Sequence, residues 1–247
     1  MDGAGSERLR SDPGRVPLVV MISIATLLFA TGLQLSDPRE RTRPLAEFPR
    51  ERTEIRAWME QHGWKSRRGS PHRFHLEGGR LRLVSRDDSV LIGTEEGMPL
   101  DPEEWPRLRF RLRVDRVPTE TNLAEKSGDD AAFRLYVAFD EGGGLFSPPN
   151  TIAYTWTEDL EPETLVHSAH FRRLRYLSVG RGVTTGDPET DGWITVERDL
   201  SADYRRVFGQ QGEVPDLVGI MLKCDSNDTQ TSGSAWLEGL ELVQRRE

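Results

Sequence analysis

The sequence predicts an all-β protein, an antiparallel and jelly-roll-like β-sandwich that follows an N-terminal transmembrane helix. Three observations support this. Residues 16–35 carry no charged side chain. About ten short stretches after residue 71 have the alternation or the apolar runs of strands, and Gly, Pro and Asp separate them. Hardly any helical period occurs among these stretches, which is typical of a sandwich of short strands.

The amino terminus divides into a tail and an apolar segment. Residues 1–15 form a short tail with three arginines. As a helix, residues 16–35 would reach about 30 Å at about 1.5 Å per residue, which matches the hydrocarbon core of a bilayer. We expect a transmembrane anchor or an uncleaved signal. The alternative is a secretory signal cleaved near the small residues Ala30 and Gly32.

The sequence around this segment supports two opposite orientations in the membrane. Five arginines between residues 39 and 52 outnumber the three before the segment, and the positive-inside rule would then keep the domain on the cytoplasmic side. A short amino-terminal tail is instead usual for an exported, anchored domain. We therefore predict a single-pass inner-membrane protein with its domain in the periplasm, or a secreted domain if the signal is cleaved.

Residues 36–52 are rich in Pro and Arg and show no apolar period, so they are predicted to form an extended linker. Residues 53–63 are predicted to form a short helix, because Ile55, Trp58 and Met59 fall on one helical face. The β-sandwich domain is predicted to occupy residues 53–247.

The rest of the domain reads as strand, turn and strand. A second short helix is predicted at 201–209, capped by Ser201 and ended by Gly209. Strands are expected at 72–76, 79–85, 89–93, 107–114, 131–140, 151–157, 173–179, 193–198, 217–224 and 234–243.

The run 129–140 is predicted to be the central strand. Its side chains alternate in character with the period of a strand, so one face should lie in the core and the other outside it. Two aspartates before the run and glycines 142–144 after it supply turn chemistry. The predicted core residues are Leu108, Phe110, Phe133, Leu135, Val137 and Phe139, and Arg134, Tyr136 and Ala138 form the other face of the central strand.

Composition excludes some classes of function. A net charge of −8 argues against a nucleic-acid partner, because such proteins collect unbalanced Lys and Arg on one surface. The single cysteine, Cys224, excludes an intrachain disulfide and a zinc site of several thiolates. Because Cys224 ends the apolar run 217–224, we expect it in the core.

Five motifs then occur in a characteristic order. They are the run 129–140, Tyr154-Thr155-Trp156, Trp193 followed by Arg198-Asp199-Leu200, Asp203-Tyr204-Arg205 with Phe208-Gly209, and Gly219-Ile220 before Asp225-Ser226-Asn227-Asp228-Thr229. In this order they resemble a bacterial family of unknown function, numbered 3047, over roughly residues 48–243.

The resemblance implies a secreted or membrane-anchored β-sandwich, similar to galactose-binding-like jelly rolls and carbohydrate-binding modules. It implies no established activity. The chain departs from the expected family pattern at Phe110 and Leu112, where tryptophans are expected, and in the acidic loop 225–229, which reads Asp-Ser-Asn-Asp-Thr rather than Asp-Thr-Asp-Asn-Thr. If those positions touch a ligand, the ligand of this member differs.

Four arginines alternate along the strand 107–114 and therefore share one face. Guanidinium groups bind carboxylate, phosphate or sulfate, so Arg109 and Arg111 are candidates to bind an acidic glycan, with Arg134 and Tyr136 extending the surface. The alternative is a solvated face on which these arginines pair with acids of neighbouring strands.

Tyr154 and Trp156 lie two residues apart and share a face, as sugar-stacking aromatics would. Ile152 is in register with them, so the alternative is that this face belongs to the core.

Asp225, Asn227 and Asp228 bring together oxygen ligands of the kind that calcium prefers. They do not complete an EF-hand loop, because Gln230 stands where glycine is needed. A structural calcium site shared with Asp129 or Asp130 is one interpretation, and a tight turn of Asx type is the other. No other cofactor is predicted.

The leading functional hypothesis is a non-enzymatic binding module for envelope glycan or another polymer. One alternative is a polysaccharide hydrolase that uses loop carboxylates around Asp129 and Asp225, although no catalytic residue is assigned. Another alternative is a structural partner in an envelope protein assembly. Fold analogy alone supports the glycan.

Overall fold

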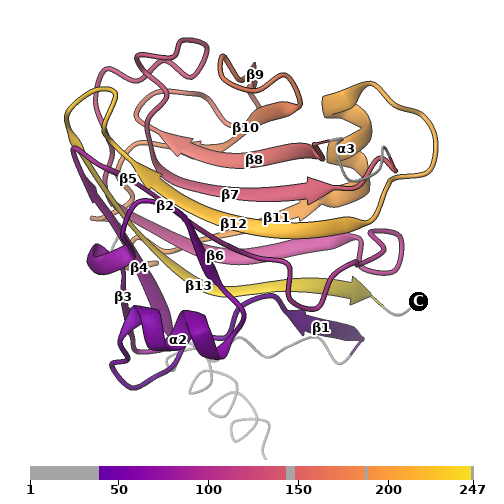
Figure 1. The fold of residues 1–247 in the computed structure, drawn as a ribbon, viewed down its shortest axis with the longest axis horizontal. Helices are drawn as coiled ribbons and strands as arrows, with labels where there is room; N and C mark the ends of the chain where they lie inside the picture. The colour runs from indigo at the N-terminus through magenta and orange to yellow at the C-terminus, as the bar shows by residue number, and fades with distance from the viewer. Residues whose placement is uncertain (1–38, 143–147, 187–188, 246–247) are drawn as a thin grey trace, which may run out of the picture. The chain divides into compact units, whose positions relative to one another are not determined.

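The computed structural model describes residues 39–142, 148–186 and 189–245, and these form a two-layered β-sandwich (Figure 1). One layer is a six-stranded sheet of β1 (Glu40–Pro44), β3 (His75–Glu77), β4 (Arg80–Arg86), β6 (Arg107–Arg116), β11 (Ile194–Asp199) and β13 (Ser232–Arg245). The other, within the same described residues, is a seven-stranded sheet of β2 (Lys65–Arg68), β5 (Ser89–Thr94), β7 (Ala131–Phe139), β8 (Asn150–Thr157), β9 (Leu165–His167), β10 (Leu174–Arg181) and β12 (Leu217–Asp225). The predicted all-β sandwich is confirmed.

The strand order places β7 in the middle of the seven-stranded sheet, which runs β2-β5-β12-β7-β8-β10-β9. The prediction that the run 129–140 contains the central strand is therefore confirmed. The pairs along this sheet are antiparallel except that β8 and β10 are parallel. This pair departs from the predicted antiparallel pattern, because residues 158–173 return the chain to the same end of the sheet before β10 begins.

The core lies between the two sheets. The rings of Phe110 on β6 and Phe133 on β7, one from each sheet, have centroids 5.5 Å apart. The predicted core residues are confirmed, since Leu108, Phe110, Phe133, Leu135, Val137 and Phe139 each have 0% of their surface exposed. Cys224 is also buried, and its thiol contacts Ser85 Oγ at 3.2 Å.

Three strands of the described residues were not predicted. β1 lies within the segment predicted to be a linker, yet it pairs with β13 from Glu40 opposite Arg245 to Pro44 opposite Glu241. β2 and β9 were missed as well. The four residues of β2 are all exposed, and β1 and β9 have no fully buried residue, so none of the three carries an apolar period. Backbone pairing holds them at sheet edges.

Within the described residues, two α-helices flank the sandwich, and both were predicted; a third, short helix, η1 (Pro71–Arg73), was not. α2 (Ile55–Gln61) buries Ile55, Trp58 and Met59, as expected. α3 (Leu200–Phe208) ends at Gly209 in the left-handed conformation, with φ of 68°. The predicted cap, Ser201, is wrong: the helix begins one residue earlier, and the Asp199 carboxylate accepts a hydrogen bond of 2.8 Å from the Ala202 backbone N–H.

Among the described residues, no helix has the length and apolar character needed to cross a bilayer. The predicted transmembrane segment, residues 16–35, lies outside the described residues.

Candidate functional site

The outer face of the seven-stranded sheet carries rows of side chains that strand register aligns. Directly paired residues project to the same side of a sheet. One row therefore runs Arg68, Leu91, Lys223, Arg134 and Thr155 across β2, β5, β12, β7 and β8. The next row runs Met221, Tyr136, Ala153 and Tyr176 across β12, β7, β8 and β10. The first row is cationic, and the second is apolar and aromatic.

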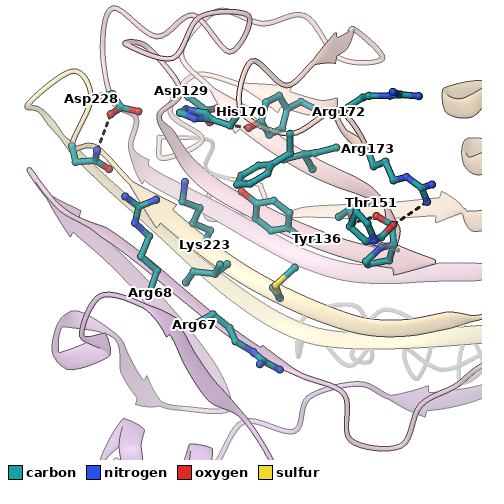
Figure 2. Close-up of a pocket in the computed structure, with 18 residues that line it drawn as sticks. Arg67, Arg68, Asp129, Tyr136, Thr151, His170, Arg172, Arg173, Lys223 and Asp228 are labelled. Atoms are coloured by element: carbon teal, nitrogen blue, oxygen red, sulfur yellow. Dashed lines mark hydrogen bonds and ion pairs between the residues drawn. The ribbon is translucent and has the colours of Figure 1, made fainter. Parts of the chain in front are cut away.

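A cleft lies over these two rows, and Figure 2 shows the residues that line it. Its volume is about 800 Å³, which falls within the range of roughly 300–1,000 Å³ usual for ligand pockets. The lining residues are Arg67, Arg68, Leu91, Asp129, Tyr136, Pro148, Pro149, Thr151, His170, Phe171, Arg172, Arg173, Leu174, Tyr176, Met221, Lys223, Asn227 and Asp228. Apolar side chains and cationic groups thus dominate the cleft.

Beneath the cleft, the fully buried Arg134 holds a network of charges together. Its Nη2 donates to Asp129 Oδ1 at 2.8 Å, and its Nη1 lies 3.2 Å from Asp225 Oδ2. The guanidinium also lies 4.8 Å from the centre of the Tyr176 ring. Lys223 forms a second ion pair with Asp225. Burying these charges is costly, so each depends on its partner.

Asp129 connects this network to the loop 168–173 between β9 and β10. Its Oδ2 accepts a hydrogen bond of 2.8 Å from the Tyr176 hydroxyl, and His170 Nε2 lies 3.5 Å away. Burial raises the pKa of Tyr176, so this hydroxyl remains a donor at neutral pH. Both oxygens of Asp129 are therefore engaged at the edge of the cleft.

Asp130 lies next to this network but does not line the cleft. Its Oδ2 accepts two hydrogen bonds from Thr229, from the backbone N–H at 2.7 Å and from the hydroxyl at 2.8 Å. Its Oδ1 is buried without a hydrogen-bond partner in the described part of the chain. Burial raises the pKa of Asp130 against the effect of these hydrogen bonds. The contacts with Thr229 fix the loop that carries Asn227 and Asp228.

Aromatic rings supply much of the apolar surface of the cleft. Tyr136 is 7% exposed and forms part of the floor, and burial raises its pKa. Phe171 stands at the edge with 67% of its surface exposed, more than the other exposed large hydrophobic side chains of the described residues, Val183 and Ile194. An exposed ring beside an aromatic floor is a surface on which a flat apolar ligand face can pack.

The predicted arginine face lies on the opposite layer. Arg109 donates to Glu241 Oε1 at 2.8 and 2.9 Å and to Glu40 Oε2 at 2.7 Å. Arg111 donates to Glu238 Oε2 at 2.7 Å. These arginines pair with acids of neighbouring strands, as the alternative interpretation held. The prediction that Arg134 and Tyr136 extend this surface is wrong, because β6 and β7 belong to different sheets.

Tyr154 and Trp156 are not available for stacking on a sugar, so that prediction is corrected in favour of core burial. Tyr154 has 0% of its surface exposed, and its hydroxyl donates to Asp203 Oδ2 at 3.0 Å. Trp156 is 3% exposed and donates to the Gly182 carbonyl at 2.7 Å. A Cβ at Gly180 would lie 1.9 Å from the Trp156 ring, so glycine is required there.

The calcium interpretation does not fit the contacts of Asp225, which is bound by Arg134, Lys223 and the backbone N–H of Ala131. Asn227 donates to Asp228 Oδ1 at 2.8 Å, as in a turn. Within the described residues, no group of three or more His, Cys, Asp or Glu side chains could hold a metal ion. Asn227 and Asp228 line the cleft instead.

Sequence reasoning placed Tyr136, Asn227 and Asp228 among the candidate site residues, and the structure brings these three together in the cleft. It missed Arg68 and the loop residues His170, Phe171, Arg172 and Arg173. A signal was present in the run His-Phe-Arg-Arg, which places an aromatic ring among basic residues between two strands. Loops on a rigid sheet are common positions for binding residues.

Comparison with known proteins gave one family match. The model of a family described as protein of unknown function (DUF3047) matches residues 57–241. The search of curated proteins found no match.

Solved structures similar to this chain include two glycanases and a binding module. A thermostable cellulase derived from the Cel12A cellulase of Rhodothermus marinus has a TM-score of 0.39 and 15% identity, over 73% of this chain and 96% of that chain. A family 11 carbohydrate-binding module from Clostridium thermocellum, in complex with a mixed-linked tetrasaccharide, has a TM-score of 0.30 and 10% identity, over 87% and 94%. The xyloglucanase domain of NopAA from Sinorhizobium fredii, in complex with cellobiose, has a TM-score of 0.36 and 9% identity, over 84% and 98%.

Proposed function

We propose a function for this chain, which belongs to the DUF3047 family of proteins of unknown function: it is a binding module for a carbohydrate polymer. The ligand occupies the cleft on the outer face of the seven-stranded sheet. The cleft joins an aromatic floor, a cationic row and an exposed ring at its edge. A sugar ring has an apolar face and a polar edge, and this arrangement offers a partner to each.

The exposed ring of Phe171 is the observation that carries this proposal. A phenylalanine that is 67% exposed contributes little to the stability of the fold, because most of its apolar surface remains in water. A ligand that covers the ring would remove this surface from water, and the free energy of that burial would favour binding. The neighbouring His170, Arg172 and Arg173 add polar groups to the same loop.

The contacts of the carboxylates favour binding over hydrolysis. A glycosidase needs two carboxyl groups free to exchange protons or attack the sugar. Asp129 is held by Arg134 and Tyr176, and Asp225 is 1% exposed and held by Arg134 and Lys223. These carboxylates are engaged in holding the sheet face together.

The proposal extends to location. Residues 16–35 anchor the chain in a membrane and place the domain on the extracytoplasmic side, where envelope polymers are found. The charge-free run of this segment supports the anchor. A reporter enzyme active only after export, fused behind residue 247, tests the orientation.

The binding function is tested with Phe171→Ala in the full chain on an array of oligosaccharides. The wild type should bind at least one class of oligosaccharide, and the variant should lose about tenfold or more in affinity, because about 1.4 kcal/mol of stacking is removed. Phe171→Tyr should retain binding.

Val183→Ala is the matched control, since Val183 is 50% exposed and lies outside the cleft. It should bind as the wild type does. Absence of binding to any oligosaccharide, or an equal effect of both alanine variants, would remove the proposed function.

A further inference from the structure

Two cationic side chains stand at one end of the cleft in the same register row. Arg68 on β2 and Lys223 on β12 are both paired with Leu91 on β5, which lies between them. Neighbouring strands are about 4.8 Å apart, so the backbones at Arg68 and Lys223 are about 10 Å apart. Long side chains at that spacing can reach one group placed above Leu91. Figure 2 shows both side chains on the same side of the cleft.

The two cations differ in how they are paired. No side-chain partner of Arg68 occurs in the part of the chain that the structure describes, although the residue is exposed at the cleft. Lys223 pairs with Asp225, which is 1% exposed and also bound by Arg134. Asp225 thus shares its negative charge between two cations, and the ammonium of Lys223 keeps donors that Asp225 does not use.

The side chains that line the cleft carry a net charge opposite in sign to that of the chain. Five cationic residues line it against two aspartates, Asp129 and Asp228, in a chain whose net charge is −8. The acids that pair with Arg67 and Arg173 are Glu95 and Glu141, which lie outside the lining. A cationic cleft in an anionic protein attracts negatively charged ligands and orients them.

The apolar residues around this end narrow the class of ligand. Leu91 and Met221 lie in the lining near Lys223, and the exposed ring of Phe171 lines the same cleft. A pyranose ring that bears a carboxylate or a sulfate presents an apolar face and an anionic group together. Guanidinium binds such groups through paired, charge-assisted hydrogen bonds.

We propose that the polymer bound in the cleft is an acidic glycan, and that Arg68 and Lys223 hold the anionic group of one of its sugar rings. This inference rests on the proposed function and names its ligand class. Arg68 is the specificity-determining residue, because it stands in register with Lys223 and no partner of its guanidinium occurs among the described residues. Arg134 positions Lys223 indirectly, through the carboxylate of Asp225 that both cations share.

The test compares two hexasaccharides that differ only in charge: oligogalacturonate and the same oligomer with its carboxyl groups reduced to the neutral galactose form. In calorimetric titrations of the full chain at low salt, oligogalacturonate should bind about tenfold more tightly than the neutral oligomer. Arg68→Gln should remove that advantage by lowering affinity for the acid about tenfold, and leave the affinity for the neutral oligomer unchanged. A higher salt concentration should weaken the binding of oligogalacturonate and leave the binding of the neutral oligomer unchanged.

Arg86→Gln is the matched control. Arg86 is exposed on β4 of the other sheet, and no partner of its guanidinium occurs in the described residues. This variant should bind both oligomers as the wild type does. A sulfated galactan oligomer tests the second anionic group, and binding of that oligomer alone, with the same dependence on Arg68, supports the proposal with sulfate as the group.

The outcomes separate the two claims. Equal affinity for acidic and neutral oligomers, with no effect of Arg68→Gln, overturns the acidic-glycan inference and leaves the binding module in place. Binding of none of the three oligomers overturns the acidic-glycan inference, and absence of binding across the oligosaccharide array as well overturns both claims. Binding of a fatty acid such as palmitate, with no binding of any oligosaccharide, also overturns both claims, and it would assign the cleft to an anionic amphiphile.

Discussion

At the scale of single residues, Arg134 shows what alternation along a strand does and does not reveal. The pattern of β7 correctly assigned Arg134 to the face away from the core, yet the residue is fully buried under the cleft. Its position demands two carboxylates, and Asp129 and Asp225 supply them from different parts of the chain. The sequence alone could not predict this, because the pair depends on which strand lies beside β7.

Arg134→Met should lower the free energy of unfolding by about 3–5 kcal/mol, because Asp129 and Asp225 would remain buried without their shared partner. Denaturant unfolding of the full chain, followed by tryptophan fluorescence, measures this change. The control is Arg86→Met, an exposed position that should change stability by no more than about 0.5 kcal/mol. Similar losses in both variants would contradict the role assigned to Arg134.

Asp130 gives a prediction about pH. Burial raises its folded pKa above the unfolded value of about 3.9, so between that value and the raised pKa the folded chain holds a proton that the unfolded chain has released. The stabilisation is present at low pH and lost as pH rises through the folded pKa. Asp130→Asn removes the titration and keeps an oxygen acceptor for Thr229.

The wild type should therefore lose stability relative to Asp130→Asn as pH rises from about 4 to 7. Denaturant unfolding across this range measures the difference. The exposed Asp159, changed to Asn, is the control and should give a profile parallel to the wild type. A parallel profile for Asp130→Asn as well would contradict the assignment.

At the scale of elements, the sequence predicted the strands that bury side chains and missed those that do not. The apolar residues of β7 and β8 make both strands recognisable in the sequence, and both were predicted within a residue or two of their bounds. β1 has no such residue and is held by its backbone ladder to β13 and by Glu40 binding Arg109. Edge pairing of this kind leaves little trace in composition.

Removing β1 should destabilise the domain. A chain that starts at Phe48 loses the ladder with β13, at roughly 0.5–1.5 kcal/mol for each hydrogen bond, and loses the Glu40 partner of Arg109. Its melting temperature should fall by several degrees below that of a chain starting at Arg39, at about 2–4 °C per kcal/mol. Glu40→Gln in the longer chain separates the ion pair from the ladder. Equal melting temperatures would show that β1 contributes nothing.

At the scale of the whole domain, the sequence predicted the two-layered architecture and most of the core, but it could not assign strands to layers. Arg109 and Arg134 both read as outward residues of neighbouring strands in the chain, yet they lie on different sheets. β6 pairs with β11 and β13, while β7 pairs with β8 and β12. The pairing of strands depends on contacts between residues far apart in sequence. A candidate surface inferred from local spacing cannot take such contacts into account.

The parallel pairing of β8 and β10 has a consequence for how such a domain can diversify. Parallel neighbours cannot be joined by a tight hairpin, so the chain needs a long return path, and residues 158–173 provide it. Part of that path pairs with β10 as β9, and the remainder carries His170 and Phe171 to the cleft. Mutations in residues 158–173 can change the side chains that contact a ligand while the hydrogen-bonded strands beneath stay intact. Related proteins could therefore acquire different ligands through changes in this one connection.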